Sequence, residues 1–271
     1  MNIGQLEGKT LNSRKLASEL LMQIVQRGKD ATGAAWVQKG ETEREVWYSK
    51  MAAPAHRFLE TGGLKQMPNR SRNVLLHTRY ATQGKPSIND NNHPIIVGGL
   101  VGVHNGHISN DNEIIRDGKF ERVGQVDSEA AFWLLSSIKD PKEALIELRG
   151  TAALAWIHVN DPTVLHLARC SGSPLHVCQT ELGSTVFAST DGHLSQALAK
   201  QGIKAMTKWD VPEWTYLTIK SGAIVDWVDI PKPKVPVVFE KPNAFGANWY
   251  SMPSLPSQGD DKRKMKEFGW L

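Results

Sequence analysis

The sequence predicts an α+β fold in which two mainly antiparallel sheets are covered by helices. Apolar residues recur with helical spacing near the start of the chain and again in 128–138. Between 151 and 188, short apolar runs alternate with turn-forming residues, as in successive antiparallel strands. Elements in this order favour sheets that bury one face under helices.

The first helix is expected in 12–26. Asn12 or Ser13 can cap its start, and its leucines repeat at helical spacing to form one apolar face. The elements expected after it are strands at 34–38 and 46–48, a short helix at 54–59, and strands at 73–76 and 95–103. The three glycines of the last run indicate tight bends or close backbone approach.

A second long helix is expected in 128–138, with Asp127 placed as its N-cap. After it we expect a short helix at 141–148, strands at 151–158, 163–168, 174–178 and 184–188, a helix at 194–200, and strands at 215–219 and 223–228. The composition then shifts to prolines and charged residues. We therefore divide the chain into one domain at 1–230 and a largely disordered tail at 231–271.

Composition excludes some classes of partner. With 271 residues, 40% of them hydrophobic, the chain can bury a sizeable core. Its net charge of +4 is the small difference between 32 basic and 28 acidic residues, so no nucleic-acid partner is indicated. No apolar run is long enough to span a membrane, and residues 1–13 are too polar for a signal peptide. We expect no membrane association and a cytoplasmic location.

The two cysteines, Cys170 and Cys178, flank a turn-forming stretch at 171–174. A hairpin centred on that turn places them opposite Leu175 and Leu167 rather than opposite each other. We therefore expect two buried free thiols with no catalytic role, in a reducing compartment.

Polar, chemically capable residues are concentrated between apolar runs in 73–110. One run is followed by HTRYAT and the next by HNGH. The fork of Arg79 can hold a carboxylate, and Asn105-Gly106 offers a side-chain amide and a bare backbone N–H as an oxyanion hole. The plainer alternatives are that Asn105-Gly106 is a hairpin turn and that Arg79 is a surface charge.

Five ordered motifs carry a resemblance to a known family. They are RGKDATG at 27–33, HTRYATQG at 77–84, NNHP at 91–94, VHNGHISN at 103–110 and DSE at 127–129. Together they resemble the glutaminase domain of class II glutamine amidotransferases, which are N-terminal-nucleophile hydrolases. The resemblance spans about 16–198. It implies a four-layer αββα sandwich and the removal of ammonia from the side-chain amide of glutamine.

The resemblance also implies roles for individual residues. Arg79 grips the α-carboxylate of glutamine with help from Thr82, and Asp127 takes the α-ammonium. Asn105 and the Gly106 N–H hold the tetrahedral oxyanion that forms when the amide is attacked. The opposite charges of Arg79 and Asp127 would select a free amino acid as the substrate.

Three further residues match the family's pattern, and the resemblance assigns them supporting roles. Arg27, with Asp30, helps to shape the site beside the nucleophile, and His93 lines the pocket. Read alone, Arg27 and Asp30 make a local ion pair, and a histidine before proline is structural. The sequence departs from many relatives at Tyr80, where tryptophan is frequent, and at Gln83, where histidine is frequent.

The family's nucleophile is a cysteine exposed as the first residue of the mature chain, and its own α-amino group acts as the base. This sequence starts Met1-Asn2. Two interpretations stay open, a truncated or mis-set start and a glutamine-binding pseudoenzyme. Nothing after Leu198 resembles a synthase or isomerase domain, so we expect any ammonia acceptor to be a separate protein. No cofactor is implied.

Two alternatives belong to other classes of function. A metal-dependent hydrolase would use Asp127 with the histidines of the 73–110 segment as zinc ligands, namely His77, His93, His104 and His107. The family resemblance implies no metal. A module that senses glutamine without turning it over would need Arg79 and Asp127 but not the cysteine.

Overall fold

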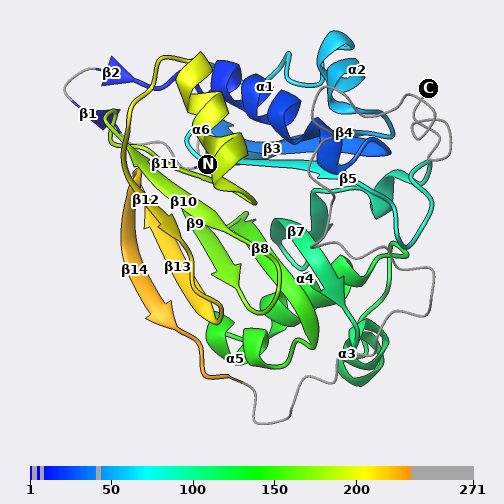
Figure 1. Cartoon of the computed structure of the whole chain (residues 1–271). Helices are drawn as coiled ribbons and strands as arrows, with labels where there is room; N and C mark the ends of the chain where they lie inside the picture. Colours follow the sequence, from blue (N-terminus) through cyan, green and yellow to red (C-terminus); the bar gives the residue numbers. More distant parts are fainter. Residues whose placement is uncertain (2–4, 7–8, 41–43, 233–271) are drawn as a thin grey trace, which may run out of the picture. The chain divides into compact units, whose positions relative to one another are not determined.

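Helices form the two outer layers of the fold, and strands form the two inner layers (Figure 1). This computed structural model describes residues 1, 5–6, 9–40 and 44–232. Of the tail expected at 231–271, all but the first two residues lie outside the described residues. None of the described helices is long and apolar enough to cross a membrane.

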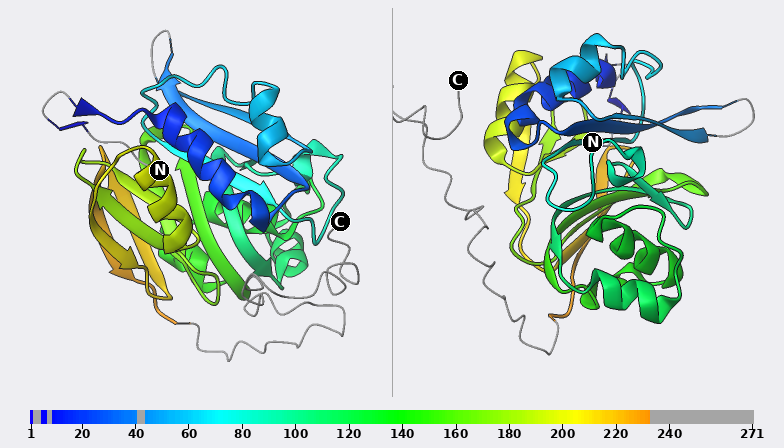
Figure 2. Two further views of the ribbon diagram at one scale, coloured as in Figure 1. Left: turned by 45° about the horizontal axis from the view of Figure 1, so that its top comes forward. Right: turned by 90° about the vertical axis from the view of Figure 1, so that its right-hand side faces the viewer.

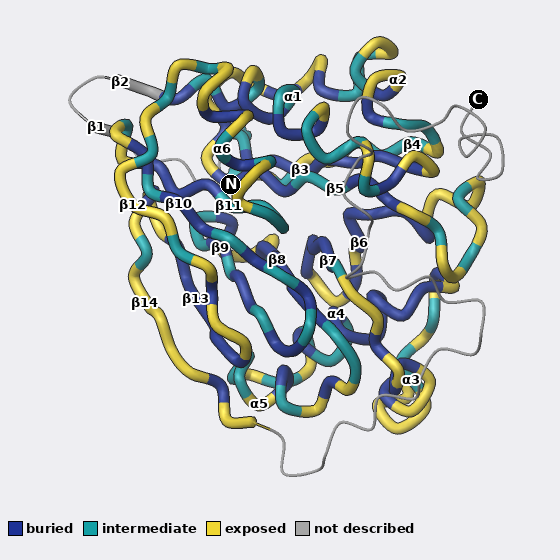
Figure 3. Tube along the Cα trace, in the orientation of Figure 1, coloured by how far each residue is buried: buried dark blue, intermediate teal, exposed yellow. Residues whose placement is uncertain are grey.

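One inner layer is a six-stranded antiparallel sheet. Its strands lie in the order β14 (Ala223–Asp229), β13 (Thr215–Lys220), β9 (Asp161–Arg169), β8 (Gly150–His158), β7 (Leu100–Ile108) and β6 (Ile95–Val97). Figure 3 shows that β14 is exposed at the outer edge, whereas its neighbour β13 is buried.

The other inner layer contains two three-stranded antiparallel sheets. The first has the order β4 (Arg44–Met51), β3 (Ala31–Lys39) and β5 (Val74–Arg79), and the second has β11 (Thr185–Ala188), β10 (His176–Thr180) and β12 (Ala205–Asp210). The short strands β1 (Gln5–Leu6) and β2 (Lys9–Thr10) pair with each other.

The helices divide between the two outer faces (Figure 2). α1 (Ser13–Ile24), α2 (Ala55–Glu60) and α6 (Asp191–Lys200) share one core with β3, β5, β10 and β11. α3 (Asp111–Gly118), α4 (Asp127–Ser137) and α5 (Pro141–Ile146) share another with the six-stranded sheet. Short 3-10 turns lie at Val25–Arg27 and Asn89–Asn91.

A third apolar core lies between the two layers of strands, and β8 shows how the sequence specifies it. Leu154 and Trp156 point to the helical core, whereas Ala153, Ala155 and Ile157 point to the other strands. Successive side chains of a strand leave opposite faces, so a continuous apolar run is needed where both faces are buried. The four-layer αββα sandwich is therefore confirmed.

Most expected elements are present with shifted ends. Asn12 caps α1, and its side chain accepts a hydrogen bond from the Lys15 N–H at 3.0 Å. The run at 95–103 is a hairpin, because β6 and β7 are separate strands that turn at Gly98-Gly99. β12 and α3 were not predicted. β12 is mostly exposed and therefore lacks an alternating apolar pattern, since main-chain bonds to β10 hold it.

The hairpin expected between the two cysteines is wrong. β9 and β10 belong to different sheets, because both edges of β9 are already occupied by β8 and β13. The 171–174 stretch instead carries the chain from one layer of strands to the other. Cys170 and Cys178 are buried free thiols, as expected, and burial raises the pKa of each.

Candidate active site

The ends of β5 and β7 meet although the two strands belong to different layers. The His77 Nε2 donates a hydrogen bond to the carbonyl oxygen of His104 at 3.0 Å. Burial lowers the pKa of His77 to about 3, so this imidazole is neutral at physiological pH. The contact joins the two stretches in which the sequence concentrates its polar residues.

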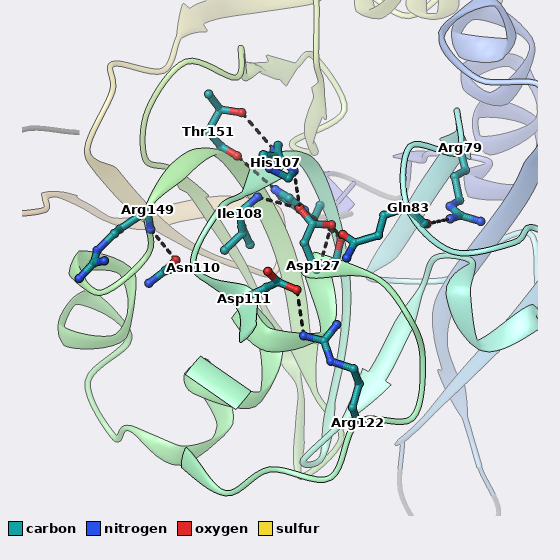
Figure 4. A network of polar contacts seen from close by, with 12 residues as sticks. Arg79, Gln83, His107, Ile108, Asn110, Asp111, Arg122, Asp127, Arg149 and Thr151 are labelled. Atoms are coloured by element: carbon teal, nitrogen blue, oxygen red, sulfur yellow. Dashed lines mark hydrogen bonds and ion pairs between the residues drawn. The ribbon is translucent and has the colours of Figure 1, made fainter. Parts of the chain in front are cut away.

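Arg79, the last residue of β5, is buried. Its guanidinium donates to Asn92 Oδ1 at 2.9 Å and to the carbonyl oxygens of Gly84, at 2.9 Å, and Gln83. Burial lowers its pKa, and the negative charges of Asp30 and Asp127 are near enough to oppose that lowering. Arg79 is therefore a buried cation on the same side of the fold as Asp127, as Figure 4 shows, and not a surface charge.

The segment that follows Arg27 is hydrogen-bonded to the end of β5, where Arg79 lies. The Asp30 N–H donates to the Arg79 carbonyl at 3.0 Å, and Asp30 Oδ2 accepts from the Ala81 N–H at 2.7 Å. A Cβ at Gly28 would lie 2.3 Å from the Arg79 carbonyl carbon, so only glycine allows this approach. The charge of Arg27 helps to lower the pKa of His77, which places it near the same site.

Asn105 and Gly106 lie inside β7, paired with Ala153 and Ala152 of β8. The hairpin-turn alternative for this pair is therefore wrong. Gly106 has a φ of 142°, and a Cβ there would lie 2.0 Å from the Thr151 carbonyl oxygen. Glycine is required at this point, because any side chain would clash with β8.

A cavity of about 90 Å³ lies beside Asn105. Its wall includes His77, His104 and, from the first residue of the chain, Met1. The Met1 amine donates to the Val74 carbonyl, and the Val74 N–H donates back to the Met1 carbonyl, as in a sheet pair. Burial lowers the pKa of this amine well below its ordinary value.

Asp127, the first residue of α4, is buried and faces β7. Its Oδ2 accepts from the Ile108 N–H at 2.7 Å, and its Oδ1 accepts from the Ser128 N–H at 2.9 Å. Burial raises its pKa, but contacts with His107, His104 and the Ile108 N–H hold it below the ordinary value. The expected N-cap role is wrong, because Val126 occupies the N-cap position and the carboxylate turns toward β7 instead.

His93 is buried, and its ring packs against that of His77 with the two centroids 4.0 Å apart. Neither ring nitrogen of His93 has a hydrogen-bond partner among the described residues. Thr82 is exposed in the loop that follows Arg79.

The metal-site alternative needs the histidines to gather around Asp127. Among residues 1, 5–6, 9–40 and 44–232, no group of three or more His, Cys, Asp or Glu side chains is placed to hold a metal ion. The His104 Nδ1 lies 2.9 Å from Ser128 Oγ, and the His77 Nε2 is bonded to a backbone carbonyl.

Sequence reasoning missed two residues that position the site. Asn92 bonds the guanidinium of Arg79, and Ser128 bonds the ring of His104. Both lie within recognised motifs, NNHP and DSE, but neither has a spacing that shows which side chain it will meet. Contacts between distant segments depend on tertiary packing.

Comparison with known proteins identifies the family. The fold is similar to glutamine phosphoribosylpyrophosphate amidotransferase from B. subtilis, solved with ADP and GMP, with a TM-score of 0.66 at 18% identity over 85% of this chain and 48% of that chain. The allosteric regulatory enzyme of purine biosynthesis gives a TM-score of 0.67 at 16% identity, again over 85% and 48%. At such identities the likeness supports the fold alone.

Relatives with detectable sequence identity are glutamine–fructose-6-phosphate aminotransferases (isomerizing). The Acinetobacter baylyi protein is 32% identical over 60% of this chain and 27% of its own length, and the Zymomonas mobilis protein is 34% identical over 58% and 26%. The chain thus spans about a quarter of the length of these relatives.

The sequence profile of the glutamine amidotransferases of class II matches residues 21–160, which is more than half of the chain. The matched range includes Arg79, Asn105 and Asp127, and the charges of Arg79 and Asp127 lie near enough to influence each other. The chain belongs to the class II glutamine amidotransferases.

Proposed function

We propose that the domain at 1–230 binds free glutamine between Arg79 and Asp127 and holds its side-chain amide at Asn105. The observation that carries this proposal is the pair of opposite charges. A buried guanidinium and a buried carboxylate, from elements of different layers, lie near enough to influence each other. A zwitterionic amino acid presents the complementary charges, and Thr82 would assist at its carboxylate.

Release of ammonia requires a nucleophile beside the amide. We place it at the cavity shared by Met1 and Asn105. The thiolate of an N-terminal cysteine would attack the amide carbon, while Asn105 and the Gly106 N–H stabilise the oxyanion. The amide nitrogen takes up a proton and leaves as ammonia, and water then hydrolyses the thioester. The α-amino group of that cysteine would act as the base.

The remaining assignments follow the same proposal. Arg27 and His93, which both lie near His77, would help to shape the site. A separate synthase or other acceptor protein would receive the ammonia. A domain that binds glutamine without turnover is the alternative.

Calorimetry and ammonia release test the proposal together. The chain that begins at Met1 should bind glutamine and release no ammonia. A version in which Met-Cys-Gly precedes Met1, processed to expose the cysteine, should release ammonia, and the matched Met-Ser-Gly version should not. In the cysteine version, Asn105→Ala should lower kcat about 100- to 1000-fold, because one oxyanion donor is lost. Absence of glutamine binding in every version would overturn the proposal.

A further inference from the structure

Asp127 has a second neighbour besides the backbone groups that fix it. The His107 Nδ1 lies 3.5 Å from Asp127 Oδ2, the same oxygen that accepts the Ile108 N–H. The His107 side chain is 69% exposed, whereas that of Asp127 is 12% exposed. The imidazole therefore lies on the open side of the carboxylate, where a ligand would approach (Figure 4).

The other charged groups around His107 also favour a cation. The hydrogen bond to Asp127 raises the pKa of His107, partial burial opposes this, and the charges of Asp127 and Asp111 add to the increase. Asp111, at the start of α3, is itself paired with Arg122 at 2.8 Å. On the buried side of β7, His104 is kept neutral because burial lowers its pKa.

Further out, Arg149, which directly precedes β8, pairs with Glu113 of α3 at 3.1 Å. Its guanidinium is thus satisfied by another carboxylate. Of the groups that face Asp127 in the described part of the chain, His107 is the one with an ordinary pKa close to neutrality and a shift toward the charged form.

We propose that protonated His107 competes with the α-ammonium of glutamine for Asp127, so that His107 sets how glutamine affinity depends on pH. This inference rests on the proposed function, because it places the ammonium at Asp127. Two cations cannot share one carboxylate oxygen without repulsion. Glutamine must therefore displace the imidazolium, or bind after His107 has lost its proton.

The direction follows from proton linkage. Asp127 stays ionised above pH 6, because its pKa is lowered, and the ammonium of a free amino acid stays protonated up to pH 8. Glutamine should then bind more tightly as the pH rises through the pKa of His107. If one proton is displaced, and since the His107 pKa is above its ordinary value, affinity should be at least about fourfold weaker at pH 6 than at pH 8.

The test is calorimetric titration with glutamine at pH 6, 7 and 8. His107→Gln and His107→Ala should each bind with a Kd that varies less than about twofold over this range, and more tightly than the unmodified chain at pH 6. His176→Gln is the matched control, because His176 lies 3.9 Å from another carboxylate, that of Asp210. It should retain the full pH dependence.

A second measurement does not need glutamine. The NMR titration of the His107 ring should give a pKa above the ordinary value, and Asp127→Asn should lower it. Glutamine binding with the same pH dependence in the His107 variants would overturn this inference and leave the proposed function intact. Absence of glutamine binding at every pH, in all variants, would overturn both.

Discussion

The two charged ends of the site are held in different ways. Arg79 donates to the Asn92 side chain and to two backbone carbonyls, all of them neutral acceptors. Asp127 accepts from backbone N–H groups but also faces the exposed ring of His107. The groups that accept hydrogen bonds from Arg79 are neutral, although Asp30 and Asp127 lie near enough to raise its pKa. His107, in contrast, offers Asp127 a direct partner that changes its charge near neutral pH.

This difference predicts how each end of the site responds to substitutions and to pH. Apart from Asn92, the acceptors at the Arg79 end are backbone carbonyls, which substitution of their own side chains does not remove. An end that faces an imidazole depends on both the residue and its protonation. Substitutions at each end should therefore have different effects on stability and affinity.

The largest effect is expected when the Arg79 end is removed. Arg79→Ala leaves three acceptors without their donor and should lower the free energy of unfolding by about 3 kcal/mol. Glutamine should no longer raise the melting temperature, since its carboxylate loses its partner. Arg116→Ala is the control, because that arginine is 72% exposed and pairs with Asp117 on the surface. Urea unfolding that gives equal losses for both variants would contradict the buried anchoring of Arg79.

An intermediate effect is expected from two buried histidines, His93 and His104. Burial lowers the pKa of His93 and His104, whereas the unfolded chain binds protons with a pKa of about 6.5. Their contribution to stability is present above that pH and is lost as the pH falls below it. Each should reduce the free energy of unfolding by up to about 1.4 kcal/mol per pH unit.

His107 should contribute with the opposite sign. Its pKa is raised, so its contribution is present below the unfolded-state pKa and is lost as the pH rises through the folded-state pKa. Urea unfolding at pH 7, 6 and 5 checks both signs, and His107→Gln should leave the loss at acid pH in place. Equal stability at pH 5 and pH 7 would show that the buried histidines take up protons without cost.

The smallest effect is expected at Gln83. The Gln83 side chain is exposed, and Arg79 is bonded to its backbone carbonyl. Gln83→His should therefore change the Kd for glutamine by less than about threefold, measured by calorimetry at pH 8. A larger change would show that the side chain at this position takes part in binding. The Arg79 end would then depend on nearby side chains, as the Asp127 end does.

The sequence by itself determined the layers and the family. Helical spacing and the alternation of strands with turns are local patterns in the sequence. The burial of both faces of β8 is likewise indicated by a continuous apolar run. The five motifs place Arg79, Asn105 and Asp127 in order along the chain, and the family match covers all three. Edge strands such as β12 escaped prediction, because main-chain bonds hold them without an apolar pattern.

Only the tertiary structure decided which strands pair and which side chains meet. The 171–174 stretch contains turn-forming residues in either case, but the occupied edges of β9 exclude a hairpin there. Likewise His104 and His107 lie three residues apart in one motif. One is buried beside Ser128 and the other is exposed beside Asp127, so burial lowers the pKa of the first and a carboxylate raises that of the second. Charge and burial depend on neighbours from distant segments, and those neighbours are set by packing rather than by local sequence.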